Sequence, residues 1–244
     1  MNGYNQPTYD QHYDEDYGPV FSLDKPDVRM SFIRKVYLIL SAQLTLSALL
    51  VTLSVYSEGY RNFLQNNIWL LIVAAITSVI TSYALICYKS CARTVPQNYV
   101  LLSLFTASEA YMISCITLEA KPILVFIAAL LTAGIVVSLT IYAITTKRDF
   151  TMCGGLLFMF LMTLFLASFL LFFIHNKVLE IIISAFSVIL FGIYLIYDTQ
   201  LIIGGRNREL SVDDYIIGAL MLYIDIVRIF IEILRILSVL TNNN

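Results

Sequence analysis

The chain alternates between long apolar stretches and short polar connections. A helix needs about 20 apolar residues to cross the hydrocarbon core of a bilayer, and six stretches are long enough to do so. They predict membrane-spanning helices at residues 33–56, 68–88, 98–118, 123–145, 153–174 and 178–203. Gly204 and Gly205 follow the sixth stretch and are a common stop signal for a helix.

A seventh apolar stretch, residues 215–240, differs from the six because it is charged. Its four charges lie three or four residues apart and alternate in sign: Asp225, Arg228, Glu232 and Arg235. At this spacing they share one face of a helix and can pair with one another. Such a helix lies flat on the membrane surface, or inside the bundle with its charged face against polar partners. The wide apolar remainder favours burial inside the bundle.

The composition agrees with a membrane protein. Hydrophobic residues make up 59% of the 244, and charged residues 13%, about half the share of about 25% that is usual in soluble domains. The net charge of −2 gives no basic field for nucleic acid. Cysteines 87, 91, 115 and 153 form no Cys-x-x-Cys pair, so we expect packing residues and no zinc site. No hydrolase, P-loop or metalloprotease motif occurs, and we expect neither catalytic residues nor a cofactor.

The first 28 residues are rich in tyrosine, acidic residues and proline. They hold too little apolar area to offset the entropy of ordering, so we expect a disordered tail, followed by one membrane domain over residues 29–240. Lys and Arg gather beside the tail and in the second, fourth and sixth loops. This distribution predicts that the tail and the even-numbered loops are cytoplasmic.

Three acids fall at membrane depth, where charged groups usually face a cavity or one another. Glu109 lies within the third stretch, Asp198 six residues before Gly204, and Asp225 about ten residues into the seventh stretch. Each could also be a single protonated acid with a hydrogen-bond partner. If two carboxyl groups meet in a low dielectric, they cannot both ionise cheaply, and the pair shares a proton in a pH-dependent way.

Calcium takes six to eight oxygen ligands, of which two or three carboxylates supply only part. A site made by Asp198 and Asp225 would therefore hold calcium weakly and transiently, which suits permeation. Asp213 and Asp214 open the seventh stretch, with Ser211 as a plausible N-cap. These acids suit the positive end of a helix, and they also suit the cytoplasmic mouth of an ion path.

The chain resembles the lifeguard branch of the transmembrane Bax inhibitor motif family, and its Golgi anti-apoptotic members most closely. The resemblance covers about residues 29–240 and rests on four segments: "IRKVYLIL" (33–40), "TTKRDF" (145–150), "IYDTQLIIGG" (196–205) and "DDYIIGALMLYIDIVRIF" (213–230). It implies an all-α membrane protein, a seven-helix bundle with a central seventh helix ringed by six transmembrane helices.

The resemblance also implies a function. Members of the family are pH-sensitive calcium leaks of Golgi or endoplasmic reticulum membranes, with a cytoplasmic N-terminus, that lower store calcium and restrain apoptosis. Calcium is the permeant ion, and partners include the lipid bilayer and possible apoptosis regulators or calcium-release channels. The family's pair of sensor aspartates corresponds to Asp198 and Asp225. Acids of its ion path correspond to Asp213 and Glu109.

One position departs from the family pattern. Where relatives often carry Asn, this chain has Arg228, three residues after Asp225. We expect the guanidinium to stabilise the charged form of Asp225, unless Glu232 holds it instead. In the first case, Arg228→Asn would move the pH midpoint of calcium efflux upward.

Two other classes of function stay open. Intramembrane aspartyl proteases of the presenilin type also pair a Tyr-Asp with a second Asp on the next helix. Their second Asp lies in Gly-x-Gly-Asp, whereas Asp225 follows Leu-Tyr-Ile. The other class is a non-conducting membrane scaffold that binds apoptosis or calcium-release proteins through its tail.

Overall fold

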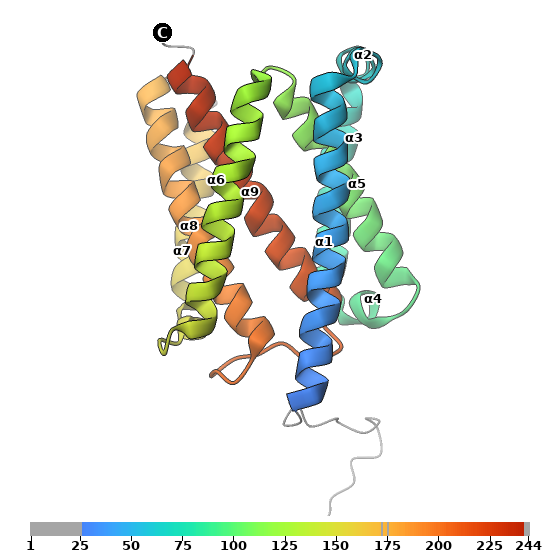
Figure 1. Cartoon of the computed structure of the whole chain (residues 1–244), viewed down its shortest axis with the longest axis vertical. Coiled ribbons are helices and arrows are strands. Elements are labelled where there is room, and N and C mark those ends of the chain that lie inside the picture. The colour runs from blue at the N-terminus through green and yellow to red at the C-terminus, as the bar shows by residue number, and fades with distance from the viewer. Residues whose placement is uncertain (1–25, 172, 175, 242–244) are drawn as a thin grey trace, which may run out of the picture.

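The computed structural model describes residues 26–171, 173–174 and 176–241, and all regular structure in them is helical (Figure 1). The predicted tail, apart from its last three residues, lies outside the described part. The α-helices are α1 (Pro26–Tyr56), α2 (Glu58–Asn66), α3 (Trp69–Cys87), α4 (Lys89–Arg93), α5 (Gln97–Thr117), α6 (Pro122–Thr145), α7 (Gly154–Leu171), α8 (Lys177–Ile203) and α9 (Tyr215–Thr241). A short 3₁₀ helix, η1 (Phe150–Cys153), precedes α7.

Within the described residues, six helices are long and apolar enough to cross a membrane, which confirms the six predicted stretches. They are α1, α3, α5, α6, α7 (together with η1) and α8. The first begins earlier than expected, at Pro26, so residues 26–28 belong to a helix and not to the tail. The sixth ends at Ile203, where Gly204 and Gly205 take the left-handed backbone conformation, with φ of 77° and 70°. Glycine adopts that conformation without strain, so the predicted helix stop is correct.

The charged helix α9 runs diagonally through the molecule (Figure 1). It begins at the end where α1 begins and finishes at the opposite end, near the level of α2. Its 27 residues are long enough to span the bilayer core at about 1.5 Å each. Its four charges separate it from the six helices above, in each of which the most apolar 18 residues hold at most two charged residues.

Two groups of helices meet through α9. On one side α1, α3 and α5 pack together, and on the other side α8 packs against α6 and α7. The contact between α8 and α9 is the most extensive in the described chain, followed on α9 by the contacts with α1 and α6. However, α7 packs on α8 and has no comparable contact with α9. The expected ring of six helices around the seventh is therefore incomplete.

Arg29 joins the start of α1 to the end of α8. Its guanidinium donates to the carbonyl oxygens of Leu201 (2.7 Å), Ile203 (2.9 Å) and Leu210 (2.8 Å). The last carbonyls of a helix have no partner within the helix, so Arg29 supplies what α8 lacks at its end. The guanidinium also lies so close to Gly204 that a Cβ there would approach it to 2.6 Å.

The loop between α6 and α7 is bound to the loop between α8 and α9. Asp149 accepts hydrogen bonds from the Thr151 hydroxyl (2.6 Å) and from the Asn207 amide (2.6 Å). These bonds lower the pKa of Asp149 to about 2. Gln200 of α8 adds a second link by accepting from the backbone N–H of Phe150 (2.8 Å). The two loops thus form one hydrogen-bonded unit at the end of the molecule where α1 begins.

We expect Arg29→Met to destabilise the fold. Three carbonyl groups lose a charged donor, a loss of about 2 kcal/mol, which corresponds to a fall of about 4–8 °C in Tm. Thermal unfolding of the purified protein in detergent measures the effect. Arg34→Met is the matched control, because Arg34 is exposed on the same helix. Equal Tm values for the two variants would show that Arg29 does not hold the end of α8.

Candidate functional site

Asp198 of α8 and Asp225 of α9 face each other within the protein. The residues are 4% and 3% exposed, and their carboxyl groups are close enough to share a hydrogen bond. Oδ1 of Asp198 and Oδ2 of Asp225 are buried and have no hydrogen-bond partner among the described residues. Two carboxyl groups in such contact, away from water, are most stable with one proton between them. The structure therefore brings together the two acids that the sequence suggested as a pair.

The face of α8 that carries Asp198 is polar over several turns. Tyr194 lies one turn from Asp198 and interacts electrostatically with both acids of the pair. Further along the helix, Ser187 and Ser184 are buried on the same face, and the Ser184 hydroxyl has no partner among the described residues. Polar side chains thus recur from the acid pair toward the end of the molecule where α9 finishes, with the apolar Phe191 between Tyr194 and Ser187 on the same face.

An ion cluster lies at that end of the contact between α8 and α9. Arg235 of α9 donates to Glu232 on its own helix (3.1 Å) and lies 4.0 Å from Glu180 of α8. Of the four charges on this face of α9, Glu232 and Arg235 therefore pair with each other, whereas Asp225 and Arg228 do not.

Glu109 is a separate site and does not join the acid pair. Its carboxylate accepts a hydrogen bond from Ser78 of α3 (2.5 Å). It also lies near Tyr223 of α9, whose hydroxyl shares a hydrogen bond with Ser47 of α1 (2.7 Å). Tyr223 and Asp225 are two residues apart, so they point to nearly opposite faces of α9. Glu109 and the acid pair consequently lie on different sides of this helix.

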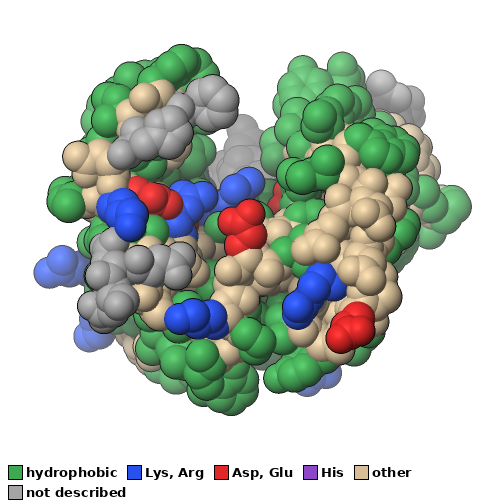
Figure 2. Space-filling view, turned by 90° about the horizontal axis from the view of Figure 1, so that it is seen from above, with side chains coloured by type: hydrophobic (Ala, Val, Ile, Leu, Met, Phe, Trp, Pro, Cys, Tyr) green, Lys and Arg blue, Asp and Glu red, His purple; other side chains and the backbone are tan. Residues whose placement is uncertain are grey.

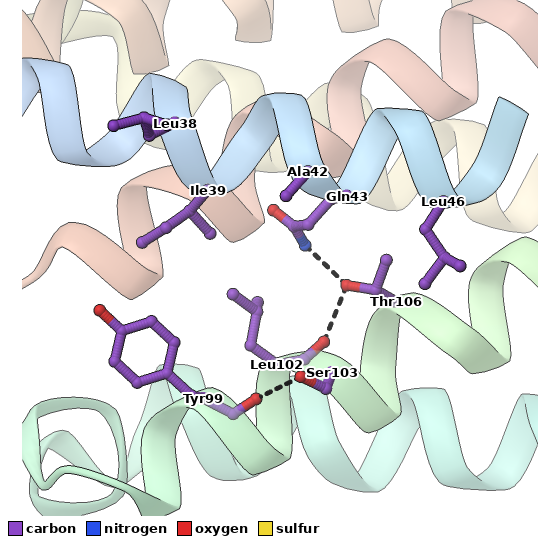
Figure 3. Close-up of a pocket in the computed structure, with 9 residues that line it drawn as sticks. All are labelled: Leu38, Ile39, Ala42, Gln43, Leu46, Tyr99, Leu102, Ser103 and Thr106. Carbon is purple, nitrogen blue, oxygen red and sulfur yellow. Dashed lines mark hydrogen bonds between the residues drawn. The ribbon is translucent and has the colours of Figure 1, made fainter.

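Further polar contacts join α1 and α5, and the sequence reasoning missed them. The Gln43 amide donates to the Thr106 hydroxyl (2.8 Å) at a groove of about 380 Å³ between these helices (Figure 3). Nearer the far end, Ser54 and Thr117 share a hydrogen bond (2.8 Å). The residues Gln43, Ser47 and Ser54 recur at helical spacing within an apolar stretch. That spacing is the signal that would have found them.

The two acids before α9 have different roles. Asp213 is exposed, whereas Asp214 is buried and binds Arg93 of α4 through two hydrogen bonds, Nε–Oδ1 (2.8 Å) and Nη2–Oδ2 (3.0 Å). These bonds raise the pKa of Arg93. The expected N-cap at Ser211 is wrong, because α9 begins only at Tyr215. Sequence reasoning did not single out Arg93, and nothing local in the sequence marks it.

Arg228 does not lie where the sequence suggested. Its side chain is exposed, and within the described residues no hydrogen bond or ion pair joins it to Asp225. Glu232, the other expected partner, is bound to Arg235 instead. The structure therefore gives no support to Arg228 as a modulator of the acid pair, and the expected shift on Arg228→Asn loses its basis.

Comparisons with known proteins identify relatives over most of the chain. A family model described as "Inhibitor of apoptosis-promoting Bax1" matches residues 29–243. The chain is 35% identical to protein lifeguard 3 of Homo sapiens over 219 residues, which cover 88% of this chain and 70% of that protein. It is 33% identical to protein lifeguard 4 of Mus musculus over 225 residues, 92% of each chain.

We expect the neighbouring acids Asp213 and Asp214 to respond differently to the same substitution. Asp214→Asn deprives Arg93 of its carboxylate, and we expect Tm to fall by about 2–4 °C, equivalent to about 1 kcal/mol. Asp213→Asn, the matched control, should change Tm by less than about 1 °C, because Asp213 is exposed, forms no hydrogen bond among the described residues and acts on Arg93 only electrostatically. Thermal unfolding in detergent measures both. A larger effect at Asp213 would contradict this assignment.

Proposed function

This chain belongs to the Bax inhibitor family that includes the lifeguard proteins, and we propose that it is a pH-sensitive calcium leak channel of intracellular membranes that restrains apoptosis. The observation that carries the proposal is the buried contact between Asp198 and Asp225. Few structural reasons exist for two facing acids inside an apolar bundle, because each costs desolvation and together they repel.

The acid pair works as a latch between α8 and α9 in this proposal. With one proton between them, the two carboxyl groups attract each other and hold the helices together. Without that proton they repel, or they accept a cation between them. A change in pH therefore changes the packing of the most extensive helix contact in the described chain.

Calcium is the ion that we assign to this pair. Two carboxylates provide at most four of the six to eight oxygens that calcium takes, so water must supply the rest. Among the described residues, no group of three or more Asp, Glu, His or Cys side chains is arranged to hold a metal ion. A site with so few ligands binds weakly, and weak binding allows an ion to leave again on the far side.

Ion pairs lie at both ends of the proposed path. At one end Asp214 is bound to Arg93, and Asp213 lies exposed beside it. At the other end Arg235 links Glu180 and Glu232. In the proposal these ion pairs hold the described conformation closed, and α9 acts as a seventh membrane helix along which the ion passes.

The orientation and location also belong to the proposal. The start of α1 and the loops before α5, α7 and α9 lie at one end of the molecule (Figure 1). These segments hold basic pairs such as Lys147 and Arg148. The positive-inside rule makes that end cytoplasmic, with the end of α9 in the lumen. The resemblance to the Golgi lifeguard branch suggests a Golgi or endoplasmic reticulum membrane.

An intramembrane aspartyl protease is the second candidate, since facing aspartates on neighbouring helices are also what such an enzyme uses. The sequence before Asp225 is Leu-Tyr-Ile and not Gly-x-Gly, which favours the leak. Proteoliposomes separate the two functions. Calcium flux without cleavage of a transmembrane peptide supports the leak, and cleavage without flux supports the protease.

We expect Asp198→Asn and Asp225→Asn each to flatten the pH dependence of calcium efflux from proteoliposomes. Either change leaves only one titrating group, so the shared proton is lost. The control is Asp149→Asn. Asp149 has a pKa of about 2 and stays charged throughout the assay, so this variant should keep the pH response. Efflux that follows pH unchanged in both variants at the pair would refute the latch.

A further inference from the structure

One stripe of α9 is open although most of the helix is buried. Ile217, Met221, Ile224 and Arg228 follow one another at spacings of four, three and four residues. Each is less buried than the residues immediately before and after it, which are all buried. At helical spacing these four positions form one continuous face. The first three side chains of this face are apolar, and the fourth is the guanidinium of Arg228.

The stripe is open because the two groups of helices do not close over it. In the described chain, α3 and α5 have no extensive contact with α7 or α8, and α9 is the main link between the groups. Figure 2 views the molecule from the end where α9 finishes and shows a deep hollow between its halves. Lys and Arg side chains lie at the inner edge of this hollow. It opens sideways, toward the region that lipid occupies around a membrane protein.

Arg228 is unusual because a charged side chain rarely lies at the middle of a helix of membrane-spanning length. It is the fourteenth of the 27 residues of α9, hence at the middle of the helix, and it is exposed. An arginine at the centre of a membrane helix costs about 2.5–3.5 kcal/mol even on the most favourable scale. The other charges of α9 have partners: Asp225 faces Asp198, and Glu232 binds Arg235. No partner holds Arg228 within the described residues.

We propose that the hollow beside α9 binds one acidic phospholipid, with its phosphate on Arg228 and an acyl chain along Ile217, Met221 and Ile224. The planar guanidinium matches two phosphate oxygens at once. The hollow is open at the end where α9 finishes, so a head group can enter it as far as Arg228 while the acyl chain continues toward Ile217. Basic positions between membrane helices attract acidic head groups in this way. The inference stands independently of the calcium leak.

Native mass spectrometry of the full chain, released from detergent micelles, tests the lipid site. The probes are phosphatidylglycerol and phosphatidylcholine with identical acyl chains, added in equal amounts. We expect the protein to retain one phosphatidylglycerol with about tenfold preference. Arg228→Gln should abolish the preference, and Arg228→Lys should keep part of it. Sodium oleate serves as a third probe, because a free carboxylate carries a similar charge.

Arg61→Gln is the matched control. It likewise removes one positive charge, but from α2, where the Arg61 guanidinium donates to the carbonyl of Val55 (2.7 Å). This variant should keep the preference for phosphatidylglycerol. Equal retention of both phospholipids, a preference that survives in Arg228→Gln, or binding of oleate alone would each overturn the proposal. Thermal unfolding of the lipid-free variants verifies that a lost preference does not come from a lost fold.

Discussion

An ionisable side chain inside a bilayer is costly without a polar partner, and three of the four on α9, namely Asp225, Glu232 and Arg235, have one within the protein. This constraint explains why α9 lies between the two groups of helices and not at their edge. Asp225 meets Asp198 on α8, and Glu232 meets Arg235 close to Glu180. Helices α5 and α8 bury one acid each, Glu109 and Asp198, whereas α9 has four charges along one face and needs polar groups from its neighbours.

The same constraint divides the interior into two polar regions. On the α8 side of α9 lies the acid pair, with buried serines along the helix contact. On the opposite side lie Glu109, Ser78 and the shared hydrogen bond of Ser47 with Tyr223. Because α9 presents Tyr223 to one region and Asp225 to the other, a rotation of this helix would disturb both at once. The apolar bundle therefore contains one element whose orientation is fixed from two sides.

The six membrane helices could be predicted because apolar length is a local property of the sequence. The end of α8 before Gly204 could be predicted because glycine is a common helix stop. The pairing of Asp198 with Asp225 was predicted from the resemblance to the lifeguard family. The choice between Asp213 and Asp214 could not be predicted, since it depends on the residue at which α9 begins and on Arg93, which is remote in sequence. The expected contact of Arg228 with Asp225 is missing from the structure for a related reason. Helical spacing places Arg228 near Asp225, but the packing of the two helix groups decides what its side chain faces. The position of α7 outside the ring is also a matter of packing between helices, on which periodicity carries no information.

Arg29 has a mechanical consequence for the acid pair. It stands in the first turn of α1 and donates to the carbonyls of Leu201 and Ile203 in α8, three and five residues beyond Asp198. Tension on the chain ahead of Pro26 would therefore pull on the helix that carries Asp198. Through this contact, a partner that binds the chain ahead of Pro26 can displace Asp198 without entering the helix bundle.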